Sequence, residues 1–67
     1  MVNQNVRDAI EDSGLKQKFI AEKTGISEQA LSAMTNGKQK IGVDEFFALC
    51  EVLRKTPEEL YNYKKGA

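Results

Sequence analysis

Residues Gln17 to Met34 read QKFIAEKTGISEQALSAM, and this stretch decides the fold. Its pattern predicts two helices of about eight residues each, joined through Gly25, Ile26 and Ser27. Gly25 can adopt a positive φ angle, which a sharp turn with little connecting chain often requires. Ala21 is small enough to let the second helix come close, and the apolar Ile26 would fill the space between the helices. These residues predict two short helices packed across a tight turn.

The second helix of this pair, over about residues 27–36, is predicted to have Ser27 as its N-cap and two chemically different sides. Ala30, Leu31 and Met34 share one side, which must pack on the domain. The opposite side is formed by Glu28, Gln29, Ser32, Ala33 and Asn36. A helix that meets only solvent usually carries pairs of Lys and Glu, so this composition favours close approach to another molecule. Residues 17–36 therefore predict a helix-turn-helix, in which the second helix enters the major groove of DNA.

The remainder of the chain predicts three more helices and no strand. They are expected over about residues 4–13, about residues 43–53, and from Pro57 to about Tyr63. Thr56-Pro57-Glu58-Glu59 offers a capping box with proline at the first helical position, which is a strong helix start. The tail, residues 64–67, is expected to be frayed. The sequence thus predicts an all-α fold of five short helices.

Length and composition exclude several classes of protein. The chain has 67 residues, which predicts one domain over residues 1–67. It has no histidine and one cysteine, Cys50, which excludes an internal disulfide, a Cys/His zinc site and the usual nucleophile–histidine pairs of hydrolases. We therefore expect no enzymatic activity, no metal and no cofactor. The longest apolar run, Phe46 to Cys50, is too short to cross a membrane, and Met1 to Asn5 do not resemble a signal peptide. These features predict a cytoplasmic protein without a membrane partner.

The charges are unevenly distributed along the chain, although the formal net charge is zero. Residues 16–40 contain five lysines and two acids, a net charge of +3, and the remaining residues carry a net charge of −3. A molecule of this kind can approach a polyanion with one face while the other face limits indiscriminate binding. The alternative is that solvated lysines simply flank helices, and charge alone leaves both interpretations open.

The segment from Leu15 to Ile41 resembles the DNA-binding domain of the Cro and lambdoid repressor family, also called the XRE family. The resemblance rests on Gln17, Ala21, Gly25, Ile26-Ser27, Leu31 and Asn36-Gly37-Lys38. It implies a compact, five-helix, lambda repressor-like domain that binds double-stranded DNA. It also implies a sequence-specific transcriptional regulator, most simply a bacterial or phage repressor.

The resemblance assigns roles to individual positions. Side chains facing the bases are expected at Glu28, Gln29, Ser32 and Ala33. Phosphate contacts are expected from Lys16, Gln17, Ser27, Asn36, Lys38 and Lys40. The helix side that faces the bases has no arginine, so the commonest contact to guanine is missing.

Three of the predicted base contacts have a specific chemistry. The Gln29 amide suits the N6 and N7 atoms of adenine, although it can also be an ordinary exposed glutamine. Glu28 can accept from the N4 amine of cytosine, or it can act only as an acid that stabilises the N-terminus of its helix. Ala33 can make only an apolar contact, for example with a thymine methyl group.

A second surface is predicted near the C-terminus. The helix over residues 43–53 is apolar almost all round, which is typical of a helix that is central or covered by a partner. We expect a homodimer contact that includes Val52, Leu60, Tyr61 and Tyr63. Two recognition helices would then lie about 34 Å apart on one side of the DNA. The alternative is that the fifth helix itself covers the extra apolar face. Cys50 is expected to be a small buried apolar residue.

A different class of function also fits the sequence. The acidic and aromatic C-terminal half could bind another protein, as in an interaction module or an antitoxin-like partner. Alanine substitution of Gln29 and Lys38 separates the two hypotheses, since only a DNA-binding regulator should lose operator binding.

Overall fold

The helix-turn-helix segment folds as its sequence predicts. In the computed structural model, which describes residues 2–66, the segment forms α2 (Gln17–Thr24) and α3 (Glu28–Thr35). Gly25 ends α2 with a φ angle of 77°, and its N–H donates to the carbonyl of Ala21 at 2.9 Å. Ser27 precedes α3, and its hydroxyl accepts from the Ala30 N–H at 3.1 Å. The turn therefore satisfies polar groups at the ends of both helices.

Residues 2–66 also contain the three other predicted helices: α1 (Val2–Ser13), α4 (Val43–Leu53) and α5 (Pro57–Tyr61). Thr56 and Glu59 form the predicted capping box at the start of α5, with hydrogen bonds of 2.8 and 3.1 Å. Two boundaries differ from the prediction, because α1 begins two residues earlier and α5 ends at Tyr61. The all-α fold is confirmed over the described residues, in which no strand occurs.

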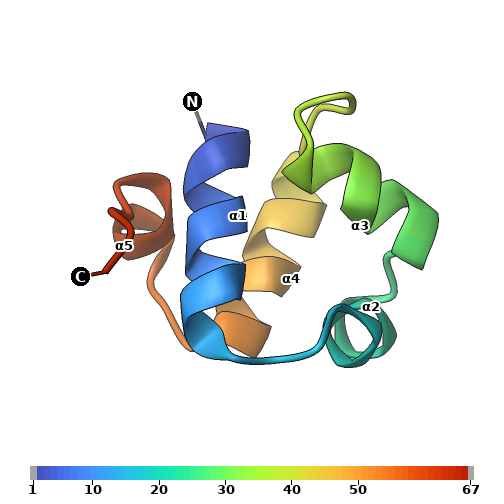
Figure 1. Ribbon diagram of the computed structural model, residues 1–67, viewed down its shortest axis with the longest axis horizontal. Coiled ribbons are helices and arrows are strands. Elements are labelled where there is room, and N and C mark those ends of the chain that lie inside the picture. The colour runs from blue at the N-terminus through green and yellow to red at the C-terminus, as the bar shows by residue number, and fades with distance from the viewer. Residues whose placement is uncertain (1, 67) are drawn as a thin grey trace.

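Two helices in the middle of the molecule organise the rest. Figure 1 shows α1 and α4 side by side, with α5 against α1 on one side and the α2–α3 pair on the other. Ile26, the apolar turn residue, is buried as predicted, and so is the small Ala21 of α2. The core contains Val6, Ala9, Ile20, Ala21, Ile26, Leu31, Met34, Leu49, Cys50, Leu53 and Leu60. α3 is thus fixed to the bundle through its inner side.

The C-terminal tail is attached to the end of α1, whereas the sequence predicted a frayed tail. The Tyr63 hydroxyl and the Gly66 N–H both donate to Oδ2 of Asp12, at 2.6 and 2.7 Å. Lys65 Nζ lies 2.6 Å from Oε1 of Glu11. The prediction is wrong for residues 65 and 66, because α1 supplies acceptors that the local sequence of the tail does not reveal. The last residue of the chain, residue 67, lies outside the described part.

Candidate nucleic-acid interface

α3 lies at the edge of the bundle and keeps one side free of the core (Figure 1). Its inner side is anchored by Leu31 and Met34, which are fully buried. The four predicted base-contacting residues lie outside the core: Glu28 and Gln29 are exposed, and Ser32 and Ala33 are half-buried. The free side of α3 therefore consists of short or uncharged side chains, apart from Glu28 at its first position.

The start of α3 is tied to the start of α2. Gln17, the first residue of α2, donates from Nε2 to the carbonyl oxygen of Glu28 at 3.4 Å. Lys16 precedes Gln17, and its side chain is exposed. Since Ser27 precedes Glu28 directly, three of the predicted phosphate-contacting residues gather beside the first turn of α3.

The loop after α3, residues 36–42, folds back onto the end of that helix. The N–H groups of Lys38 and Gln39 donate to the carbonyl of Ala33, at 2.8 and 3.2 Å. The side chain of Asn36 donates to the Ser32 hydroxyl at 3.4 Å. These contacts leave the side chains of residues 36–40 exposed, including those of Lys38 and Lys40. The remaining three predicted phosphate-contacting residues are thus brought together at the C-terminal end of α3.

Sequence reasoning missed a further residue at this end of α3. Asn3, in the first turn of α1, donates from Nδ2 to the carbonyl oxygens of Met34 and Gln39, at 2.8 and 2.9 Å. Its acceptors lie 31 and 36 positions further along the chain. A polar residue near a helix start carries no sequence signal for so distant a contact.

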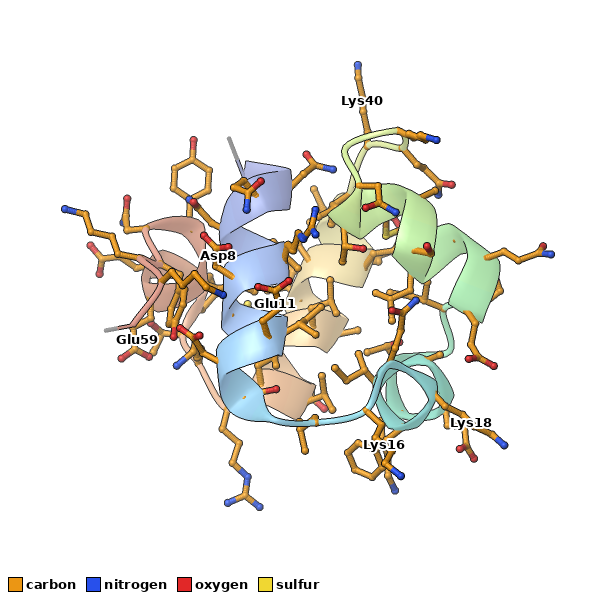
Figure 2. The ribbon with its side chains drawn as sticks, in the orientation of Figure 1. Asp8, Glu11, Lys16, Lys18, Lys40 and Glu59 are labelled. Carbon is orange, nitrogen blue, oxygen red and sulfur yellow. The ribbon has the colours of Figure 1, made fainter. Side chains whose placement is uncertain are left out.

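The lysines of residues 16–40 form no ion pair with the acids that the structure describes. Among residues 2–66, the ion pairs join Arg7 and Lys65 to Glu11 and Asp12, all outside this segment. In Figure 2, Lys40 extends from the loop that follows α3, and Lys16 and Lys18 lie beside α2, the helix that precedes it. Positive charge that is available to a ligand is therefore present at α2 and at the loop after α3.

Part of the acidic charge lies on the part of the molecule opposite α3. Asp8, Glu11 and Glu59 lie on α1 and α5, away from α3 (Figure 2). The hydrogen bond from Lys65 lowers the pKa of the Glu11 carboxyl, and the hydrogen bond from Tyr63 lowers that of Asp12. Both carboxylates are therefore stabilised in their charged form by the tail. Since Glu28 begins α3 and Asp44 and Glu45 lie in the first turn of α4, the charge is only partly segregated in space.

The predicted dimer contact is rearranged by the fold. Leu60 is fully buried in the core of the monomer, so its expected place at the contact is wrong: α5 packs on α1 through this side chain. Tyr61 is 61% exposed, and Val52 and Tyr63 are half-buried. Lys55 Nζ lies 5.0 Å from the centre of the Tyr63 ring, so the lysine side chain covers part of this ring.

The apolar residues of α4 are exposed at the start of the helix rather than at its end. Val43 is 70% exposed and Phe47 is 53% exposed, whereas Leu53 is buried. Cys50 is buried on the same helix, as predicted, and burial raises the pKa of its thiol. It therefore packs as a small apolar residue.

The sequence was also compared with known proteins. A family model described as Helix-turn-helix matches residues 6–60. No curated protein and no solved structure gives a match. None of the helices formed by residues 2–66 is long and apolar enough to cross a membrane.

Proposed function

The chain belongs to the XRE-type helix-turn-helix family of DNA-binding regulators, and from this premise we propose that it binds double-stranded DNA sequence-specifically as a transcriptional repressor. The whole chain, residues 1–67, would act as one binding unit of bacterial or phage origin, in the cytoplasm and without a cofactor. One observation carries the proposal: the free side of α3 has short or uncharged side chains apart from Glu28, and lysines that form no ion pair with the described residues lie beside α2 and in the loop after α3. Such a helix fits in the major groove of DNA, and the lysines can form ion pairs with the phosphates beside the groove.

We propose that α3 contacts bases through four positions. Gln29 is the principal one, because its exposed amide can donate to N7 and accept from the N6 amine of adenine. Ala33 would contact a thymine methyl group, and Ser32 would make a single hydrogen bond to a base edge. Glu28 occupies the first position of α3, where a carboxylate also stabilises the helix N-terminus. The favoured half-site is therefore rich in A·T pairs. A base contact from Glu28 would add a cytosine at the position that faces this side chain.

The neutral phosphate-contacting residues each keep a donor for a phosphate oxygen. The Ser27 hydroxyl accepts from the Ala30 N–H, so its own hydrogen remains available. The amides of Gln17 and Asn36 each donate once within the protein and retain a second N–H. The first set of contacts would come from Lys16, Gln17 and Ser27, and the second from Asn36, Lys38 and Lys40.

We propose that the protein binds its operator as a homodimer. The contact would use Val52, Tyr61 and Tyr63, with Leu60 supporting α5 from the core. A two-fold axis there would place two α3 helices on successive major-groove faces, about 34 Å apart. The operator would accordingly be a palindrome.

Selection from random DNA duplexes at about 100 mM salt tests the proposal, because contacts to phosphate alone are already weakened there. The matched variants are Gln29→Ala and Gln4→Ala, since Gln4 is an exposed glutamine whose side chain donates to Asp8 of its own helix. We expect a palindromic motif that Gln29→Ala loses and Gln4→Ala keeps. Enrichment of a single half-site would contradict the proposed homodimer, but it would still support a DNA-binding regulator. No enrichment by folded protein would contradict the proposed function and favour the protein-interaction module.

A further inference from the structure

The side chain of Asn3 connects three parts of the molecule. Its Nδ2 atom, in the first turn of α1, lies 2.8 Å from the carbonyl oxygen of Met34 and 2.9 Å from that of Gln39. A primary amide has two N–H donors, and these two contacts use both of them. Met34 belongs to the last turn of α3, and Gln39 lies in the loop that follows. One amide therefore joins the start of α1 to the end of α3 and to the loop.

The loop depends on few contacts for its conformation. All side chains of residues 36–40 are exposed, so apolar packing does not fix this part of the loop. The N–H groups of Lys38 and Gln39 donate to the Ala33 carbonyl, and the Asn3 side chain donates to the Gln39 carbonyl. Segments with few buried contacts open locally at low free-energy cost. Removing the Asn3 amide would leave the backbone bonds from Gly37 to Met34 and from Lys38 and Gln39 to Ala33 as the restraint on this part of the loop.

We infer that Asn3 is a positioning residue for DNA binding, a role that rests on the proposed function. Its amide fixes the end of α3 and the loop in the geometry from which Lys38 and Lys40 reach phosphates. Gln39 stands between these two lysines in the sequence, so fixing its carbonyl sets where both side chains leave the loop. Asn3 itself does not touch DNA in this arrangement. Its effect passes through the backbone of the loop.

The chain contains a matched control for this residue. Asn5 lies two positions further along α1, and its Nδ2 donates to the carbonyl oxygen of Tyr61 at 2.6 Å, on α5. Both asparagines are half-buried and link α1 to the end of a later helix. Only Asn3 reaches the side of the molecule that carries α3. Asn5→Ala thus reproduces the loss of an α1 amide without disturbing the loop.

The experiment compares Asn3→Ala and Asn5→Ala with the wild type by two measurements below the unfolding temperature. The first is affinity for a duplex that carries one half-site of the selected operator, which one protomer can bind without the dimer contact of Tyr61, and the second is hydrogen exchange at the amides of Lys38 and Gln39. One hydrogen bond of this kind changes an equilibrium constant by about two- to twelvefold, so losing both contacts of Asn3 is expected to weaken binding about tenfold. The same variant should speed exchange at both amides. Asn5→Ala should stay within about twofold of the wild type in affinity, because its contact is remote from the loop.

Three results would each overturn the role of Asn3. They are wild-type affinity in Asn3→Ala, wild-type hydrogen exchange of the loop in Asn3→Ala, and an equal loss of affinity in Asn5→Ala. A role in overall stability alone would lower the unfolding midpoint of both variants and leave binding below it unchanged. Failure of the proposed function looks different, because the wild-type protein would then bind no operator. If the wild type binds the operator and Asn3→Ala binds it equally well, only the positioning role of Asn3 is refuted.

Discussion

Lys38 provides the sharpest test of how the protein holds DNA. Its backbone N–H bonds the Ala33 carbonyl, whereas its side chain is exposed and free of ion pairs among the described residues. Lys38→Ala therefore removes a charge and leaves the backbone bond in place. Lys64 is the matched control, since it is an exposed lysine after α5, in the tail that is attached to α1. Lys64→Ala removes the same charge from a different part of the molecule.

The magnitude follows from the number of lysines around α3. With Lys16, Lys38 and Lys40 each neutralising one phosphate in both protomers, the slope of log affinity against log salt is about −5.4. Lys38→Ala removes one phosphate contact per protomer, which changes the slope to about −3.6. Between about 50 and 200 mM salt, the wild-type affinity should then fall about 2,000-fold and that of the variant about 150-fold.

Fluorescence anisotropy with the selected operator, measured at several salt concentrations in this range, gives both slopes. Lys64→Ala is expected to run parallel to the wild type, because its charge is absent from the interface. The reasoning would be refuted by a Lys38→Ala slope equal to that of the wild type. It would also be refuted by equal flattening in Lys64→Ala, which would mean that net charge rather than a defined contact governs binding.

Three further predictions concern the fold. Gly25→Ala should lower the free energy of unfolding by about 1 kcal/mol in urea titrations, because φ is 77° and an added Cβ would meet nothing within 4 Å. A neutral substitution would contradict the conformational account of the turn. Leu60→Ala should cost about 2–5 kcal/mol at every protein concentration; a loss confined to high concentration would instead mark a dimer contact. The lowered pKa of Asp12 predicts stabilisation that is complete above its unfolded value of about 4 and is lost as pH falls through the lower folded value. The urea midpoint of Asp12→Asn should thus lie below that of the wild type at pH 7 and approach it at pH 2, and a gap that persists at pH 2 would contradict the assignment.

The parts of the fold that the sequence predicts correctly depend on short-range contacts. Ser27 caps α3 through an N–H three residues away, and Thr56 and Glu59 cap α5 across the same separation. Gly25 takes the positive φ that its turn requires, with a bond to Ala21 four residues earlier. Such contacts involve residues that stand together in the sequence, so composition and spacing indicate them directly.

The features that the sequence missed depend on contacts between distant residues. The five residues of α5 are too few for their periodicity to show whether Leu60 or Tyr61 lies on the buried side of the helix. The packing of α5 on α1 decides this, and it buries Leu60. The acceptors of Asn3 lie more than 30 residues away. Arg54 ends α4 in left-handed backbone with φ at 56°, a conformation that usually signals glycine. The bases that α3 would contact are further removed still, because they belong to another molecule.

The zero net charge is compatible with DNA binding because salt limits the range of each charge. The molecule measures 27 × 21 × 19 Å, whereas the Debye length at physiological ionic strength is about 8 Å. When α3 faces DNA, the acids of α1 and α5 lie away from it and are largely screened (Figure 2). In the opposite orientation the phosphates would meet α1 and α5, where Asp8, Glu58 and Glu59 form no ion pair with the described residues and would repel them. On the proposed function, this placement of charge would favour the orientation that allows base contacts and would lower non-specific binding relative to specific binding.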